Sequence, residues 1–380
     1  MVDLQMKRDL TTQEVLDLLF SYTPKIAGEK DIDRLLILMA NLGRELVVAD
    51  RCTLWLLSND GQTLWTRVAH GVPEIRMPAD KGFAGEAVRT GEPIIIKDAY
   101  EDSRFNREID LETGYRTQAM MVMPIRTNDG RVMGAFQAIN KMTPDGGFTQ
   151  KDLEHLNLTA TYSGKTLESA MLYEEVEVTQ RDAIYMLGEL AESRSRETGN
   201  HVKRVAEYCA LLGKYLGLSV ADIDLLKLAS PMHDAGKVAT PDAILKKPGR
   251  LTEEEMETMK LHTEEGRMVL SRSVKRIFQT AAEIAITHHE KWNGKGYPKG
   301  LAGEDIPLFG RIVAVADVFD ALSNDRCYKK AWPIEKVAQL FQEELGLHFD
   351  PKIGQILLDH LPEFVQINFI FRDTFVEGPH

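Results

Sequence analysis

The sequence has few cysteines, no long apolar run and fewer basic than acidic residues. Its cysteines, Cys52, Cys209 and Cys327, stand far apart and lack the paired spacing of a disulfide framework or a zinc knuckle. This usage is typical of a reducing compartment, and we expect a cytoplasmic protein. The N-terminal MVDLQMKRDL has charges where a signal peptide needs an apolar run, and no segment is long enough to span a bilayer. The sequence therefore predicts no membrane span.

The excess of acidic residues bears on the partners. The chain carries 46 Lys+Arg against 58 Asp+Glu, a formal net charge of -12 at pH 7. This charge argues against a polymeric nucleic acid as partner, because such binding relies on neutralising phosphates with cations. A small anionic substrate stays compatible, since metal ions and a few local cations offset the overall field. The 380 residues are enough for two domains.

The first 150 residues change from helical to strand-like patterning. Residues 11 to 50 show helical spacing of apolar side chains, with Thr11 or Thr12 as the cap. After Thr53, short apolar runs flank the turn Asn59-Asp60-Gly61, which is typical of a hairpin. Further strands are predicted at 93–96, 119–125 and 132–139. Helices in front, an antiparallel sheet and a helix behind predict an α+β domain.

Residues 149–196 contain almost no Gly or Pro and read as one long helix or two collinear ones. Candidate buried positions along it are Leu153, Leu156, Leu167, Met171, Val176, Ile184, Leu187 and Leu190. Heptad spacing relates Leu153, Ala160 and Leu167, and also Leu156, Ser163 and Ala170. This short, imperfect run predicts a coiled-coil linker in a parallel homodimer.

Five of the ten histidines fall between Glu197 and Asp317, beside residue types that bind metal or phosphate. Glu197 and His201 are four apart, so on a helix both project from one face and can meet the same ions. The pair His233-Asp234 follows, in which the carboxylate can bridge two cations while the imidazole binds one of them. We infer the site of a metal-dependent phosphohydrolase.

The remaining members of this constellation need polar partners inside apolar surroundings. His262 borders the apolar face of a helix that begins at the capping box Thr252–Glu255. The pair His288-His289 follows an apolar helix, and Asp317 lies within another, where a lone carboxylate implies a metal or a cation. Lys237 stands one turn beyond the His-Asp pair, where its charge can stabilise a phosphoryl transition state.

The stretches Lys81–Val88, Thr90–Pro93 and Asp98–Asn106 resemble a GAF domain of the cyclic-nucleotide phosphodiesterase and adenylyl cyclase type. A signature of that subgroup is similar to Asn140, Lys141, Phe148 and Asp152. The resemblance implies a GAF sensor domain over residues 30–172, after a helical segment at 1–29. It leaves two interpretations open, a pocket for a small molecule such as a cyclic nucleotide, or a dimerisation and spacer module without a ligand.

The motif His233-Asp234-Ala-Gly-Lys237, with the stretch from His288 to Leu301, resembles the HD-GYP family of HD phosphohydrolases, whose substrate class is cyclic di-GMP. The resemblance covers about 180–362 and implies an all-α domain. The expected fold is thus an N-terminal α+β GAF domain, joined by the long helix at 149–196 to an all-α HD-GYP domain, with a C-terminal tail at 363–380. Asn293 and Cys327 depart from the family's common Asp and Pro.

Carried over from this resemblance, one metal would be held by His201, His233, Asp234 and Asp317. Asp234 would bridge to a second ion bound by His262, His288 and His289, and Glu197 adds the acid of members with a third ion. The implied cofactors are two or three divalent ions, iron first and manganese next. Substrate contacts are expected from Lys237, Gly296, Tyr297, Pro298, Arg326 and Lys329, with Asp320 as an orienting acid.

The expected activity is hydrolysis of cyclic di-GMP by a metal-bridging hydroxide, to pGpG, GMP or both, under GAF control. One alternative is a phosphodiesterase for another cyclic dinucleotide. A second is a receptor that binds cyclic di-GMP without cleaving it, which the complete ligand set disfavours. The stretch Gly294–Gly300 lacks the frame of a phosphate-binding P-loop and is expected to form a wall of the substrate site, with a purely structural turn as the alternative.

Overall fold

The computed structural model describes residues 7–66, 75–105, 107–195, 199–325 and 330–372. The chain separates into two compact units, Met1–Glu177 and Val178–His380. Helix α5 (Gln150–Ser193) begins in the first unit and ends in the second. No helix among the described residues is long and apolar enough to cross a bilayer.

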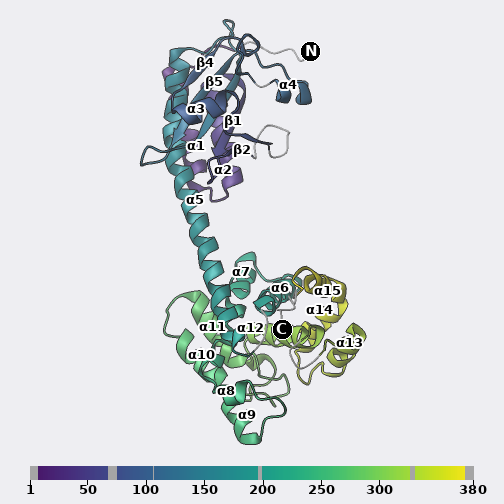
Figure 1. The fold of residues 1–380 in the computed structure, drawn as a ribbon. Coiled ribbons are helices and arrows are strands. Elements are labelled where there is room, and N and C mark those ends of the chain that lie inside the picture. The colour runs from purple at the N-terminus through teal and green to yellow at the C-terminus, as the bar shows by residue number, and fades with distance from the viewer. Residues whose placement is uncertain (1–6, 67–74, 106, 196–198, 326–329, 373–380) are drawn as a thin grey trace. The chain divides into compact units, whose positions relative to one another are not determined.

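The first unit is built on a six-stranded sheet in the order β3-β2-β1-β6-β5-β4, and all neighbours pair antiparallel (Figure 1). Its strands are β1 (Ala49–Leu57), β2 (Thr63–Thr66), β3 (Ile75–Pro78), β4 (Ile94–Ile96), β5 (Met120–Arg126) and β6 (Val132–Lys141). The predicted hairpin is the β1–β2 pair, in which Leu56 lies opposite Trp65. The expected antiparallel sheet is thus confirmed.

Helices cover both faces of this sheet. The helices of this unit are α1 (Thr12–Gly28), α2 (Ile32–Leu46), α3 (Gly82–Thr90) and α4 (Glu108–Thr113), besides the 3-10 turn η1 (Ala99–Glu101) and the first half of α5. Alternate residues of β1 enter two separate cores, because successive side chains of a strand point to opposite faces. Leu54 and Leu56 pack with α2 and α5, whereas Trp55 packs with α3.

The predicted heptad positions of α5 serve the fold of the first unit. Leu156, Ala160 and Leu167 are buried in its core instead of forming a coiled-coil seam. A helix that lays one apolar stripe on a sheet has nearly the same spacing as a coiled coil, so the pattern alone did not separate the two. Val176, Leu187 and Leu190, predicted to be buried, are exposed within this chain, as is every residue from 172 to 183.

The second unit is helical, as predicted. Its α-helices after α5 are α6 (Gly199–Tyr215), α7 (Val220–Ala229), α8 (Asp242–Leu245), α9 (Glu253–Lys260), α10 (His262–Leu270), α11 (Arg276–Thr287), α12 (Leu308–Ser323), α13 (Ile334–Glu343), α14 (Pro351–Asp359) and α15 (Leu361–Ile370). Three 3-10 turns lie between them, η2 (Ser230–Met232), η3 (Ala235–Ala239) and η4 (Gly303–Asp305). The capping box at Thr252 is present, but the predicted single helix is interrupted at Leu261, so that His262 begins α10.

The described start of the expected C-terminal tail packs within the second unit. In α15 the buried Phe364 stacks on Tyr208 of α6 and lies edge-on to Phe319 of α12, with 5.6 Å between ring centroids in each pair. Asn368 accepts a hydrogen bond from the Tyr208 hydroxyl and another from Asn324 at 3.1 Å. The start of the predicted tail is therefore part of this unit's core.

Candidate metal centre

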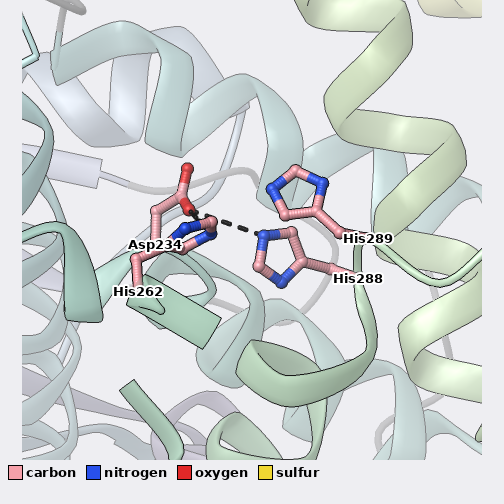
Figure 2. A group of neighbouring side chains, drawn as sticks. All are labelled: Asp234, His262, His288 and His289. Carbon is pink, nitrogen blue, oxygen red and sulfur yellow. Dashed lines mark ion pairs between the residues drawn. The ribbon is translucent and has the colours of Figure 1, made fainter. Parts of the chain in front are cut away.

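Two groups of histidines and carboxylates lie close enough to bind metal ions. Asp234, His262, His288 and His289 form the first group (Figure 2), and Glu192, His201 and His233 form the second. Within each group, one ligand atom of every residue lies within 4.8 Å of those of the others. The adjacent residues His233 and Asp234 belong to different groups, so a single turn of chain supplies both.

Close packing between η3 and α10 brings Asp234 to His262. A Cβ atom at Gly236 would lie 1.8 Å from the His262 carbonyl oxygen and 2.5 Å from the Gly266 amide nitrogen. Because glycine has no side chain, η3 can lie directly against α10. As a result, Asp234 Oδ1 lies 3.1 Å from His262 Nε2 and 3.5 Å from His288 Nε2.

The chain itself fixes the orientation of the buried imidazole rings. The Nδ1 atom lies 2.9 Å from the Ser230 carbonyl oxygen in His233, 2.6 Å from that of Met259 in His262, and 3.0 Å from that of Ala285 in His288. A carbonyl oxygen only accepts, so Nδ1 carries a proton and Nε2 faces the centre, where it offers a lone pair whenever the ring is neutral. The Nε2 atoms of these three rings and Asp234 Oδ1 are buried without a well-formed hydrogen bond.

The electrostatics of the centre suit a bound cation. Burial lowers the pKa of both His288 and His289, which keeps these rings neutral at pH 7. Burial alone would raise the pKa of Asp234, but the charges of Lys237 and His233 hold it well below its usual range. Burial would also lower the pKa of His233, yet Asp234 and Asp317 raise it to about 10. The neutral rings of His288 and His289, an ionised carboxylate and surplus negative charge suit a divalent ion, which would take the place of the proton on His233 Nε2.

A second carboxylate on α12 orients His201. Asp320 Oδ2 lies 2.7 Å from His201 Nδ1, and Arg204 donates to both oxygens of Asp320, at 2.6 and 3.0 Å. Burial alone would raise the pKa of Asp320, but these two partners lower it. Asp317, one turn earlier on the helix, has Oδ1 at 3.8 Å from His201 Nε2 and 4.0 Å from His233 Nε2.

Lys237 reaches the centre from η3. Its ammonium lies 2.6 Å from Asp234 Oδ2 and 3.2 Å from Glu192 Oε2. A positive charge therefore stands beside the carboxylate that is expected to bridge two ions.

The loop after His289 closes over the same group. The Tyr297 ring centroid lies 4.7 Å from that of His289, and the Tyr297–Pro298 peptide bond is cis. Glu290, which is buried, ties the loop down, because its two carboxylate oxygens accept hydrogen bonds from the amides of Lys299 at 2.8 Å and Leu301 at 3.0 Å. Tyr297 thus lies beside His289 of the first group.

The structure brings together most of the predicted site residues. The exceptions are Glu197, Arg326 and Lys329, which lie outside the described residues. Sequence reasoning missed Glu192 and Glu290. Glu192 had a detectable signal, as an acid near the end of a predicted helix, whereas Glu290 gave no sign that it binds backbone amides nine and eleven residues ahead.

The predicted GAF motif forms structural ties in the first unit. Lys141 Nζ lies 2.5 Å from Asp152 Oδ1 and donates to the Val47 carbonyl oxygen at 3.0 Å, with both charged side chains buried. Asn140 has a positive φ of 55°, and its side-chain oxygen accepts from the Gln118 amide at 2.7 Å. Phe148 is buried in the core that α5 covers. These contacts hold the end of β6 to the start of α5.

Comparison with known proteins agrees with this division. The GAF domain family matches residues 31–167 and the HD domain family matches residues 185–353. The 3'3'-cGAMP-specific phosphodiesterase 2 of Vibrio cholerae is 46% identical over 231 residues, which cover 60% of this chain and 44% of the relative. A cyclic di-GMP phosphodiesterase of the same organism is 44% identical over 213 residues, covering 53% and 43%.

A third relative is the cyclic di-GMP phosphodiesterase response regulator RpfG of Xanthomonas campestris, which is 43% identical over 193 residues, covering 51% of each chain. The present chain spans about half the length of these curated relatives. The family matches fall on the two units that the structure separates. The chain therefore joins a GAF domain to an HD domain.

Proposed function

We propose that the protein is a metal-dependent phosphodiesterase that hydrolyses cyclic dinucleotides, with cyclic di-GMP as the first substrate to test. The observation that carries this proposal is the pair of adjoining groups around His233 and Asp234, in each of which buried ring nitrogens and carboxylate oxygens lie within 4.8 Å of one another. Relatives named as phosphodiesterases of cyclic di-GMP and of 3'3'-cGAMP support the reaction class.

The residues proposed to hold the ions are the predicted set. His201, His233, Asp234 and Asp317 would hold one ion, and Asp234, His262, His288 and His289 a second. Glu197 remains the candidate for a third ion. Nitrogen and oxygen ligation favours iron, then manganese, over metals that seek thiolates. Such ions supply Lewis acidity, which activates water and polarises a phosphodiester.

The chain's own residues orient and stabilise the substrate in this proposal. Lys237 places its charge beside Asp234, where a phosphoryl oxygen gains negative charge in the transition state. Tyr297 and Pro298, with Gly296, shape the wall next to His289. A Cβ atom at Gly296 would lie 2.4 Å from Glu290 Cα, so the loop needs glycine there to stay close to the site. Arg326 and Lys329 are proposed phosphate contacts.

The substrate is best tested by comparing the turnover of the two dinucleotides that the relatives' names suggest. We would measure turnover of cyclic di-GMP and of 3'3'-cGAMP by chromatography, using protein purified without air and analysed for metal. Cleavage of cyclic di-GMP with two or three ions per chain is expected, and the products separate pGpG from GMP. Faster cleavage of 3'3'-cGAMP would favour that second candidate, supported by the relative of 46% identity. Metal-loaded protein that binds both without cleavage would indicate a receptor.

We further propose that the protein acts in the cytoplasm as a homodimer. The buried free thiols Cys52 and Cys209 suit a reducing compartment. On α5, the exposed side chains of Leu172, Val176 and Leu190 follow heptad spacing in a register different from the predicted one. Sedimentation of the full chain and of a Leu172→Glu variant tests this, since a dimer that uses this face should dissociate in the variant.

The GAF domain is proposed to control hydrolysis, with a small molecule or a cyclic nucleotide as its ligand. Turnover measured with and without added cyclic AMP or cyclic GMP checks this proposal. An unchanged rate with both nucleotides would favour the spacer interpretation.

A further inference from the structure

The last turn of α5 and the residues after it contact the segment that carries Lys237. Glu192 contacts the Lys237 ammonium through Oε2 at 3.2 Å. Arg194 donates to the main chain of the same segment, to the Val238 carbonyl oxygen and to that of Thr240 at 3.1 Å. One end of α5 thus holds both the side chain and the backbone of the η3 region.

Burial of the Glu192 carboxylate beside Lys237 costs free energy. Its side chain is 1% exposed, and a buried carboxylate is stable only when it is paired and hydrogen-bonded. Ser195 supplies a hydrogen bond to Oε2 at 2.9 Å, and the Lys237 ammonium supplies the opposite charge. The Lys237 side chain is itself only 13% exposed.

Two interpretations of Glu192 compete. It lies within ligand distance of His201 and His233, so it could bind an ion directly. Its carboxylate also faces the Lys237 ammonium, as that of Asp234 does. When the oxygens of Asp234 are engaged by the proposed ions, Lys237 loses that partner in whole or in part, whereas Glu192 lies outside the predicted ligand set and still faces the ammonium.

We propose that Glu192 is a positioning residue that holds Lys237 toward the substrate phosphate, with Arg194 fixing the backbone beneath it. The inference rests on the proposed phosphodiesterase function, which it deepens. Because α5 is continuous from Gln150 to Ser193, a displacement of its last turn changes the position of Lys237. The charge at the site thereby becomes dependent on the helix that begins in the GAF unit.

The test compares Glu192→Gln with Glu189→Gln on the same helix, where Glu189 pairs with Lys203 at 3.2 Å. For cyclic di-GMP, or for 3'3'-cGAMP if that is the substrate, Glu192→Gln should lower kcat about 10- to 100-fold with little change in KM, because misplacing Lys237 weakens only the transition state. Metal per chain should equal that of the wild type. Glu189→Gln should leave both quantities unchanged.

A double-variant cycle separates positioning from an independent role. In a Lys237→Gln background, Glu192→Gln should cause almost no further loss of kcat, since the group that it positions is gone. Loss of metal in Glu192→Gln, or full multiplication of the two effects, would overturn the proposal. If Glu192→Gln does not fold, Glu192→Asp keeps the charge but shortens the reach, and should lower kcat with metal retained.

One readout does not depend on turnover. Amine acetylation of Lys237, followed by peptide mass spectrometry on metal-loaded protein, should become several-fold faster in Glu192→Gln and stay unchanged in Glu189→Gln. If the wild type cleaves neither dinucleotide but acetylation responds in this way, the proposed function fails and the positioning contact stands. Equal acetylation in all three proteins would refute the contact itself.

Discussion

Replacing Lys141 by Met should destabilise the first unit strongly. The ammonium is buried, with 1% of the side chain exposed, and it pairs at 2.5 Å with Asp152, whose side chain is 6% exposed. Methionine keeps the length of the side chain but removes the charge, so Asp152 stays buried with hydrogen bonds from Thr149 alone, at 2.8 Å each, among the contacts described here. Breaking a buried pair from one side costs about 3–5 kcal/mol. The Asp9 contact adds little, because that carboxylate is 58% exposed.

For a unit of this size, each kcal/mol lowers the midpoint of thermal unfolding by about 2–4 °C, so we expect a shift of roughly 6–20 °C. Scanning calorimetry of the full chain would measure it, with Lys151→Met, an exposed lysine on α5, as the matched control. Adding Asp152→Leu to Lys141→Met should recover part of the loss, because no uncompensated charge remains. A shift below about 2 °C for Lys141→Met would refute the reasoning, since it would mean that the pair is solvated.

Three further predictions concern the second unit. Burial, and to a lesser extent the charge of Lys291, lowers the pKa of His348 to about 4 from its ordinary 6.5. The imidazole is therefore protonated at a higher pH in the unfolded chain than in the folded one, so the free energy of unfolding should fall by up to about 3 kcal/mol as the pH drops from about 6.5 to about 4. Urea unfolding of His348→Gln should show a smaller fall, and an equal one would contradict the assignment. Gly236→Ala places Cβ 1.8 Å from the His262 carbonyl oxygen, so it should cost about 1–3 kcal/mol and reduce metal per chain, whereas Gly28→Ala, with open space around it, should do neither. Glu290→Gln leaves one of two loop amides without its acceptor, which should cost about 1–3 kcal/mol and speed hydrogen exchange at Lys299 and Leu301; unchanged exchange would show that the loop is held by other contacts.

Local patterns predicted the elements and the nearness of the histidines. The helix cap, predicted at Thr11 or Thr12 and found at Thr11, the β1–β2 hairpin and the helix around Asp317 depend on residues close together in the sequence, and each is present. The cluster could be inferred because buried histidines and acids need polar partners, and in an otherwise apolar core they serve as partners for one another. A site of this kind is detectable in the sequence as polar residues within apolar segments.

Contacts between distant segments were not detectable in this way. The spacing of Leu156, Ala160 and Leu167 fits a coiled-coil seam and a sheet-packing face equally well, and only the tertiary structure decides that they cover the sheet. Glu192 lies 45 residues from Lys237 in sequence, and a glutamate in a helix is too common to indicate a role in a site. The contacts of Glu290 could not be predicted either, because its partners are backbone amides, which every residue except proline has.

The carbonyl oxygens that orient His233, His262 and His288 have a consequence for protein turnover. They turn the Nε2 atoms toward the centre of the folded protein, where the charge of Asp234 is buried whether or not an ion is bound. An ion that binds only the folded unit stabilises it by mass action, by about 2.7 kcal/mol at one hundred times its dissociation constant. Under the proposed function, metal scarcity would then lower the activity of the protein and also speed its degradation by proteases. Its abundance would therefore follow the supply of the metal.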